Sequence, residues 1–226
     1  MSLENERLLK NMPAISEAEQ RSLLGRKIFI AGCGGLGGWI AEYMARLGIG
    51  EITAADPDVF DVSNMNRQLG ADTASLGESK ALTLKKRMAL VAPDMKFNAL
   101  TVALGCENAA ELIRGSDLVF DALDSIEARL TLEAACTGEG LTLVHGAVRG
   151  WSLQAAVVPP GSGMLAKIYR STKAPEDSTV LPFTPAYCAA VQCAQAASLL
   201  LGRPCELFGR LLTADLLTMQ QQIIEL

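Results

Sequence analysis

The chain has 226 residues, of which 50% are hydrophobic and 20% charged, with a mean hydropathy of +0.24 and a formal net charge of −5. This length suits one substantial α/β domain, and the composition excludes a disordered or low-complexity protein. The acidic balance argues against nucleic acid as the main partner, because binding a phosphate backbone requires a basic face.

No segment of the sequence is typical of a targeting or membrane-spanning element. The first ten residues are charged and contain no apolar run, so we expect no signal peptide. The apolar stretch 186–202 is interrupted by Gln192 and Gln195 and is shorter than the roughly 20 residues that cross a bilayer. We expect it to be a buried or interface helix, and we expect the protein to be cytoplasmic and to make no membrane contact.

The N-terminal third predicts an arm followed by a strand–helix–strand unit. Residues 1–26 form the arm, which is polar with helical spacing, and Ser16 with Glu19 fits a capping box. Residues 27–31 predict a short buried strand, 35–47 a helix and 51–55 a second strand. This order is typical of a βαβ unit.

Helices and strands continue to alternate through the rest of the chain. We expect helices at 79–91, 107–114 and 128–136, and strands at 96–102, 117–122, 141–145 and 154–158. A mobile crossover at 159–182, rich in Pro and Gly, precedes the apolar helix, and 211–226 predicts a closing strand or hairpin. The prediction is a single α/β domain over 1–226, a Rossmann-like three-layer fold with a largely parallel central sheet and a C-terminal antiparallel extension.

A glycine-rich loop follows the first strand directly. Residues 32–37 fit G-x-G-x-x-G, with glycines at Gly32, Gly34, Gly35 and Gly37. Such glycines let the backbone turn tightly and approach phosphates, whose charge faces a helix N-terminus. Asp56 ends the next strand 24 residues after Gly32, near the spacing of a ribose-binding acid. The loop predicts a nucleotide site but does not distinguish NAD from ATP, and the chain has no P-loop motif.

The residues that follow Asp56 favour ATP. Asn64, Arg67 and Lys80 stand in quick succession, and a dehydrogenase has no need of an Arg and a Lys here. A triphosphate has such a need, because adenylation builds charge on the α-phosphate and on the departing pyrophosphate. Asp124 is predicted at the carboxyl end of a parallel strand, on the ligand side of the sheet, where it is a candidate ligand for Mg²⁺.

The sequence resembles the ThiF/MoeB/HesA family, relatives of the adenylation domain of ubiquitin-activating enzymes. The resemblance covers about residues 7–217, and the S-N-x-x-R-Q element after a D-x-D strand end is its most specific part. It rests on the apolar helix and on four motifs: AGCGGLGG (31–38), ADPDVFDVSNMNRQ (55–68), LGESKA (76–81) and DALDS (121–125).

The resemblance implies a role for each matching residue. Backbone N–H groups around Gly35 take the phosphates, Asp56 takes the ribose, and Asp124 serves Mg²⁺ or the adenylate. Asn64 and Arg67 contact the phosphates, and Arg67 and Lys80 stabilise the transition state. The implied nucleotide contacts are Gly32, Gly34, Gly35, Gly37, Asp56, Asp58, Ser63, Asn64, Arg67, Lys80, Asp124 and Ser125.

The reaction that the resemblance implies is the adenylation of a small ubiquitin-like sulfur carrier. Its C-terminal Gly-Gly carboxylate attacks ATP, giving an acyl-adenylate and pyrophosphate. A carboxylate is already ionised at neutral pH, so no protein base is needed. Family members are usually homodimers, and the apolar 186–202 helix would suit such an interface.

The chain departs from the family pattern in three places. It lacks the two C-x-x-C pairs that hold structural zinc in ThiF and MoeB, so we expect no zinc site. It has no cysteine over 159–187, where sulfur-handling members carry one near position 175, and Cys188 is the nearest candidate. Lys10 stands where many members donate an arginine to the partner subunit's site, with Arg7 three residues earlier. Lysine is a point charge and cannot fork across two phosphate oxygens.

Three other functions stay open at this point. The DALDS element also suits a tRNA threonylcarbamoyladenosine dehydratase, although the acidic charge counts against a tRNA substrate. An NAD-dependent oxidoreductase is disfavoured by Arg67 and Lys80. The missing cysteines favour a degenerate nucleotide-binding scaffold, whereas the intact site residues argue against it. For His145, the only histidine, we expect a structural role.

Overall fold

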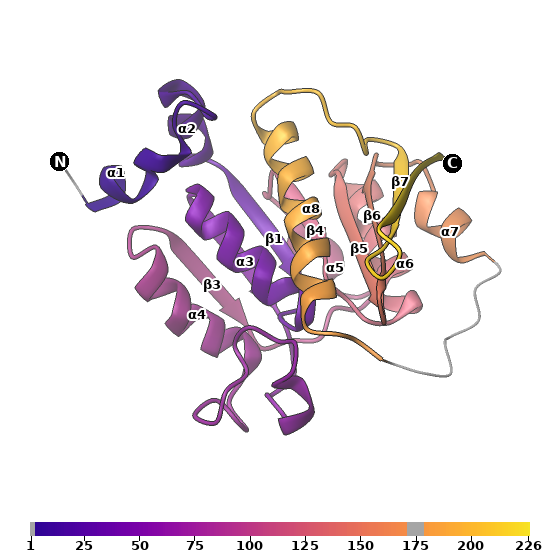
Figure 1. Cartoon of the computed structure of the whole chain (residues 1–226), viewed down its shortest axis with the longest axis horizontal. Coiled ribbons are helices and arrows are strands. Elements are labelled where there is room, and N and C mark those ends of the chain that lie inside the picture. Colours follow the sequence, from indigo (N-terminus) through magenta and orange to yellow (C-terminus); the bar gives the residue numbers. More distant parts are fainter. Residues whose placement is uncertain (1–2, 171–178) are drawn as a thin grey trace.

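One mixed sheet organises the molecule in a computed structural model that describes residues 3–170 and 179–226 (Figure 1). The described residues contain eight strands in the order β3-β2-β1-β4-β5-β6-β7-β8. Strands β1 to β5 pair in parallel, and β6, β7 and β8 pair antiparallel. The bounds are β1 Lys27–Ala31, β2 Glu51–Ala55, β3 Lys96–Leu100, β4 Leu118–Asp121, β5 Leu143–Arg149, β6 Ser152–Val158, β7 Arg210–Asp215 and β8 Gln220–Glu225. The predicted largely parallel sheet with an antiparallel extension is confirmed.

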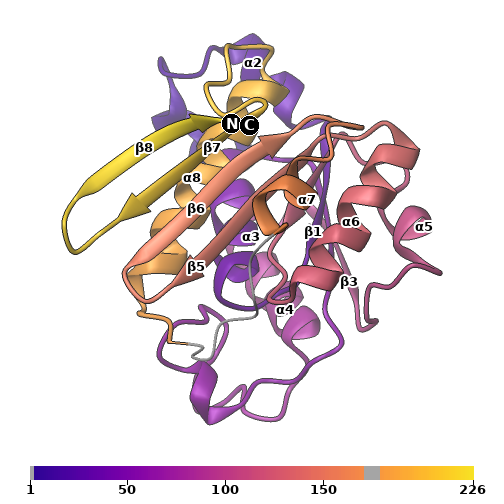
Figure 2. The same cartoon turned by 90° about the vertical axis from the view of Figure 1, so that its right-hand side faces the viewer.

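Helices cover both faces of the sheet and complete three layers (Figures 1 and 2). Helices α3, α4 and α8 share one apolar cluster with the sheet, and α5, α6 and α7 share the other. The helical bounds are α1 Leu3–Leu8, η1 Leu9–Asn11, α2 Glu17–Leu23, α3 Gly35–Leu47, η2 Val62–Asn64, α4 Lys80–Val91, α5 Ala109–Ile113, α6 Ile126–Glu139, α7 Met164–Tyr169 and α8 Phe183–Leu200. The two-sided cover explains why the central strands β1 and β4 are nearly continuous apolar runs.

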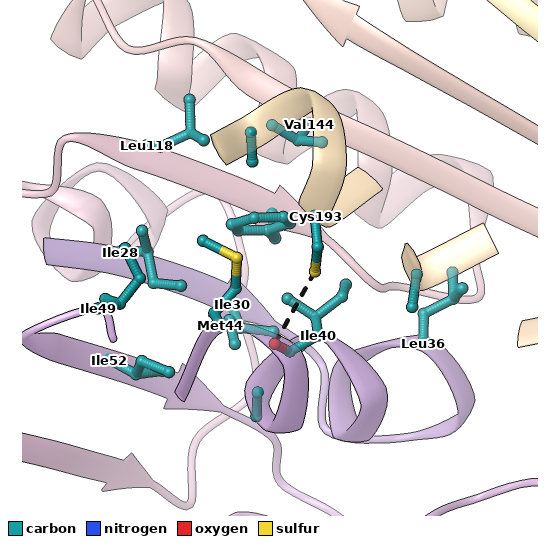
Figure 3. Packing of buried hydrophobic residues seen from close by; sticks show 14 of the residues in the cluster. Ile28, Ile30, Leu36, Ile40, Met44, Ile49, Ile52, Leu118, Val144 and Cys193 are labelled. Atoms are coloured by element: carbon teal, nitrogen blue, oxygen red, sulfur yellow. Dashed lines mark hydrogen bonds between the residues drawn. The ribbon is translucent and has the colours of Figure 1, made fainter. Parts of the chain in front are cut away.

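Strand β1 shows how the two cores are separated. Ile28 and Ile30 belong to the cluster on the α3 and α8 side, whereas Phe29 belongs to the other cluster. Successive strand residues point to opposite faces, so one apolar run supplies both cores. Figure 3 shows Ile30 of β1 beside Met44 of α3, with Cys193 of α8 facing Ile40.

The N-terminal arm folds as predicted at its second helix. Ser16 accepts a hydrogen bond from the Glu19 N–H, and the Glu19 carboxylate accepts one from the Ser16 N–H, so the capping box is confirmed. Glu19 also forms a two-pronged ion pair with Arg203, which follows α8. This contact ties the start of the chain to its C-terminal third.

The segment between β6 and α8 differs from the prediction. Residues 159–182 were expected to be a loop throughout, but Met164–Tyr169 form helix α7, whose Met164 and Leu165 are buried against the sheet. The neighbouring Pro and Gly residues hide this short helix from pattern analysis. The central part, 171–178, lies outside the described residues, as does position 175, where the family's sulfur-handling cysteine is expected.

The end of β5 and the start of α6 differ from the predicted boundaries for identifiable reasons. Strand β5 runs to Arg149 because its last residues pair with β6 after its parallel partner β4 has ended. Helix α6 begins at Ile126, earlier than expected, because Ser125 caps it by accepting a hydrogen bond from the Ala128 N–H. The C-terminal segment is a hairpin, β7–β8. Over 3–170 and 179–226, no helix combines the length and hydropathy needed to cross a membrane.

Candidate nucleotide site and adjoining groove

The predicted nucleotide residues gather at one edge of the parallel sheet. The glycine loop, Asp56 and the turn 122–124 follow β1, β2 and β4, whose carboxyl ends meet at this edge. Backbone hydrogen bonds join the three ends, from the Gly32 N–H to the Ala55 carbonyl and from the Ala122 N–H to the Ala31 carbonyl. The strand order therefore places the loop between the two acidic turns.

Steric limits explain the glycines of the loop. Gly32 has φ of +95°, and a Cβ there would lie 2.7 Å from the Ala122 carbonyl oxygen. A Cβ on Gly37 would collide with the carbonyl oxygen of Gly32. Both positions therefore require glycine for the loop to close onto α3. Gly35 is different, since a Cβ there would make only ordinary contacts, 3.5 Å from Pro185 and 3.9 Å from Arg67.

Asp56 shapes the loop from within. Its carboxylate accepts hydrogen bonds from the Cys33 N–H at 2.7 Å and the Asp58 N–H at 2.8 Å. Burial raises the pKa of the Asp56 carboxyl, although these two N–H groups and Lys80 pull it down. A carboxylate oxygen offers two lone pairs, so capacity remains for a ribose hydroxyl.

The segment after β2 is held by its own hydrogen bonds. The Asn64 side chain accepts from the Asp61 N–H at 3.1 Å, and so caps the short helix η2. The Arg67 guanidinium donates to the Ser63 carbonyl at 2.8 Å and to Asn66 Oδ1 at 3.0 Å. Ser63 therefore supports Arg67 through its backbone, and Arg67 lies beside Gly35 at the loop.

Lys80 and Asp58 form an ion pair beside Asp56. Lys80 Nζ lies 3.0 Å from Asp58 Oδ2, and the Lys80 N–H donates to the Asp58 carbonyl. The lysine side chain is 10% exposed and the aspartate 64%, so the charge of Lys80 is fixed at the rim while Asp58 faces solvent. The structure thus brings together the predicted residues Asp56, Asp58 and Lys80.

Asp124 stands at the start of a groove. Its side chain is exposed, and towards the described residues it makes no hydrogen bond or ion pair. The Ser125 hydroxyl caps α6 by accepting a hydrogen bond from the Ala128 N–H. The groove has a volume of about 1010 Å³ and is lined by Asp124 and by residues of β5, β6, β7 and β8. Uncharged polar side chains line much of it: Ser152, Gln154, Thr213, Gln220, Gln221 and Gln222.

The two candidate residues of the arm lie at the other end of α3. The Arg7 guanidinium donates to the Ala45 carbonyl at 2.9 Å, whereas Lys10 is exposed. Ala45 lies ten residues along the helix from Gly35, a distance of about 15 Å at 1.5 Å per residue. Within one chain, Arg7 is therefore a packing residue and is not brought to the glycine loop.

Sequence reasoning missed two buried side chains around the site. Gln68 packs on Gly34, and its Oε1 is buried without a partner among the described residues. Gln192 of α8 donates to the carbonyls of Asp121 and Val144, which pins the helix to the ends of β4 and β5. The glutamine of the S-N-x-x-R-Q element was the available signal for Gln68. Gln192 interrupts the apolar stretch 186–202, but nothing local in the sequence indicates its partners.

Two cysteines near the site are buried. Burial raises the pKa of Cys188, which is 0% exposed, to about 12, and raises the pKa of Cys33 well above its usual value. A thiol needs to ionise to act as a nucleophile, so the burial of Cys188 argues against a sulfur-handling role for it. Among the residues with described positions, no three His, Cys, Asp or Glu side chains are grouped to hold a metal ion by themselves.

A glycine loop and a buried acid at the carboxyl edge of a Rossmann-like sheet, with fixed cationic side chains beside them, define a nucleotide-binding α/β protein. The chain belongs to the ThiF family, whose model matches residues 6–226. The predicted family is therefore confirmed.

Two relatives are similar over nine-tenths of the chain. The SAMP-activating enzyme E1 of Haloferax volcanii is 31% identical over 216 residues, covering 92% of this chain and 79% of that protein. The sulfur carrier protein adenylyltransferase of Thermus thermophilus is 32% identical over 218 residues, covering 91% of this chain and 80% of that protein. A tRNA threonylcarbamoyladenosine dehydratase of Haemophilus influenzae is 35% identical, but only over 118 residues, covering 52% of this chain and 45% of that protein.

Solved structures confirm the fold. PaaA superposes with a TM-score of 0.86 at 18% identity, covering 100% of this chain and 74% of that one. Escherichia coli MccB, solved with ATP, superposes with a TM-score of 0.85 at 16% identity, covering 99% of this chain and 72% of that one. The family membership and the two relatives similar over nine-tenths of the chain make it an ATP-using adenylyltransferase, as the sequence predicted.

Proposed function

We propose that this adenylyltransferase uses Mg-ATP to activate the C-terminal carboxylate of a small sulfur-carrier protein whose tail ends in Gly-Gly. The observation that carries the proposal is that Asp124 lines the groove and also follows β4 at the edge of the sheet that holds the glycine loop. The amides and hydroxyls among the lining residues of the groove suit an extended peptide tail, whose backbone N–H and C=O groups need partners.

The step itself is a displacement at the α-phosphate. A carboxylate oxygen of the tail forms a bond to the α-phosphorus, and the bond from that phosphorus to the β-phosphate bridging oxygen breaks. Pyrophosphate leaves with the electron pair, and the product is an acyl-adenylate. Arg67 and Lys80 supply positive charge where the phosphates become more negative.

The residues present fit Mg²⁺ and ATP. Asp124 offers an exposed carboxylate that is free of ion pairs with the described residues, and such an oxygen is the ligand type that Mg²⁺ prefers. Bound Mg²⁺ would neutralise charge on the phosphate oxygens. Gly35 leaves open backbone at the start of α3, where N–H groups can face phosphates, and Asp56 retains lone pairs for the ribose.

Pyrophosphate exchange tests this proposal. Labelled pyrophosphate should enter ATP only when a carrier ending in Gly-Gly is present. Arg67→Ala and Asp124→Ala should each lower the exchange rate by roughly 10²-fold or more, because each removes a charged group from the transition state. Arg21→Ala is the matched control, since Arg21 is exposed on α2 with only a local ion pair to Glu17. Full exchange in both site variants would refute the proposal.

We further propose that the protein works as a homodimer in the cytoplasm. All six cysteines are unpaired, which fits a reducing compartment. In the family pattern an arm residue reaches the partner subunit's site, and of the two candidates Lys10 is exposed whereas Arg7 is bonded within its own chain. Lys10→Ala should therefore slow adenylation, and Arg7→Ala should mainly lower the melting temperature. Equal and negligible effects on the rate would remove the arm from the mechanism.

The dehydratase is the second candidate, supported by the Haemophilus influenzae relative. The net charge of −5 and the narrower match make it the weaker one. The two functions separate cleanly in an assay with threonylcarbamoyl-adenosine tRNA in place of the carrier. Conversion of that tRNA without carrier-dependent exchange would favour the dehydratase.

A further inference from the structure

A buried polar cluster lies between the groove and the turn that carries Asp124. Asp121 and His145 are both 0% exposed, and Arg129 is 8% exposed. Gln154 and Tyr169 complete the cluster and line the groove, together with Arg129. Buried polar groups are costly unless they are hydrogen-bonded, so a cluster of this size calls for an explanation beyond packing.

The hydrogen bonds of the cluster run in one direction. Gln154 Nε2 lies 3.1 Å from His145 Nε2, and since an amide nitrogen only donates, His145 Nε2 is an acceptor. The ring proton is therefore on Nδ1, 2.6 Å from Asp121 Oδ2. The Tyr169 hydroxyl accepts from Arg129 and from Gln154, each at 2.7 Å, and lies 3.2 Å from His145 Nε2, to whose one lone pair it donates alongside Gln154. Donors thus lead from Arg129 through Tyr169 and His145 to the Asp121 carboxylate.

Both ends of this series of hydrogen bonds contact Leu123, the residue before Asp124. The Leu123 N–H donates to Asp121 Oδ1 at 3.0 Å. The Leu123 carbonyl accepts from Arg129 at 2.6 Å and 3.2 Å. With both backbone groups of one residue fixed, the position of the next residue, Asp124, is set by the cluster.

We infer that His145 is a positioning residue that fixes the turn 122–124, and with it Asp124, and links this turn through Tyr169 to the wall of the groove. His145 supplies the hydrogen bond to Asp121 Oδ2, from which Arg129 Nε is 3.7 Å away. Without the histidine, the buried carboxylate would draw Arg129 towards itself and away from the Leu123 carbonyl. The inference rests on the proposed function, in which Asp124 serves the nucleotide.

Four variants of the full-length chain test this inference. His145→Ala removes the donor to Asp121, and His145→Asn restores a donor at the position of Nδ1. Tyr169→Phe removes only the hydroxyl, and so tests the link even if His145→Ala does not fold. Glu42→Gln is the control, because Glu42 is buried and holds Arg46 and Arg87 on the α3–α4 side. Each is measured by kcat and KM for ATP in pyrophosphate exchange and by amide hydrogen exchange at Leu123.

The expected pattern separates positioning from stability. His145→Ala should lower kcat by about 10- to 100-fold, the usual cost of losing a group that orients a ligand, and change KM for ATP much less. Its Leu123 amide should exchange at least about 10-fold faster, as expected when a local hydrogen bond opens. His145→Asn should recover most of the Leu123 protection. Tyr169→Phe should lower kcat because Arg129, which holds the Leu123 carbonyl, loses the hydroxyl that it donates to. The Leu123 N–H should stay protected, since Asp121 still receives its donor from His145.

Other results would overturn the inference. One is a His145→Ala variant with wild-type kcat and wild-type Leu123 protection. Another is a Glu42→Gln variant that shows the same losses, which would make the effect one of general stability. If His145→Ala does not fold, wild-type kcat in Tyr169→Phe is decisive against the link. If the wild-type chain catalyses no exchange, the proposed function fails, and Leu123 protection alone decides whether His145 fixes the turn.

Discussion

At the scale of single residues, the glycine loop contains positions with two different constraints. Gly37 is required by packing, because a side chain there meets backbone of the loop itself. Gly35 has room for a methyl group, so packing does not require glycine there, whereas the proposed phosphate contact does. A substitution at Gly37 should therefore affect stability, whereas a substitution at Gly35 should affect nucleotide affinity.

Gly35→Ala should fold normally and bind Mg-ATP weakly. The added Cβ makes ordinary contacts with Pro185, but it stands where phosphates approach the N-terminus of α3. We expect an unchanged melting temperature without nucleotide and a much smaller rise on adding Mg-ATP than in the wild type. A full nucleotide-induced rise would show that phosphates do not approach Gly35.

Gly37→Ala should instead destabilise the protein, by about 1–3 kcal/mol, since the loop must shift to admit the methyl group. Gly138→Ala is the matched control, because Gly138 lies in α6 with open space around it. Alanine favours a helix over glycine by about 0.5–1 kcal/mol, so the control should gain stability. Urea unfolding of both variants gives the comparison, and equal shifts would contradict the steric argument.

At the scale of elements, the arm is fastened by a contact that depends on pH. The Arg203 guanidinium, with the backbone and hydroxyl of Ser16, lowers the pKa of Glu19 from 4.5 to about 2. A carboxyl whose pKa is depressed in the folded state stabilises the fold above its unfolded pKa, and this contribution is lost as the pH falls through the folded pKa. The docking of α2 should therefore weaken between about pH 4.5 and pH 2.

Arg203→Met should remove most of this pH dependence. The difference in urea midpoint between wild type and variant should shrink as the pH falls from about 5 to about 2. A remainder that does not vary with pH is expected, because Arg203 also donates to the Ala14 carbonyl. A difference that stays constant over the whole range would show that Glu19 does not gain from this partner.

The elements that were predicted well are those with strong local signals. The glycine loop, Asp56 and the capping box all follow from residues close together in sequence. Helix α7 was missed because it is short and lies among Pro and Gly residues. The buried cluster was missed for another reason: His145 is 24 residues from both Asp121 and Tyr169, and only the strand order and the return of α7 bring them together. Its histidine was expected to be structural, and no local pattern indicates its partners.

At the scale of the whole molecule, one sheet separates two apolar cores. Ile40 of α3 lies in one core and Leu132 of α6 in the other, and both are 0% exposed. If the chain is one domain, the cores cannot unfold separately, because they share the strands between them. We expect Ile40→Ala and Leu132→Ala each to cost about 2–5 kcal/mol.

Both substitutions should shift one and the same unfolding transition. Circular dichroism of the helices and tryptophan fluorescence, from Trp39 beside the first core and from Trp151, should report coincident midpoints in both variants. Two separated transitions in either variant would show that the molecule contains two independently folding units.

The position of β1 in the sheet has a consequence for synthesis on the ribosome. Its neighbour β4 lies 90 residues further along, as the pairing of Ile28 with Leu118 shows. Every predicted nucleotide contact has been translated once Ser125 is made, but helix α8, which covers α3, still awaits translation. A nascent chain can thus hold the pieces of the nucleotide site while its larger apolar face is uncovered. During that interval the growing chain depends on chaperones, or on speed, to avoid aggregation.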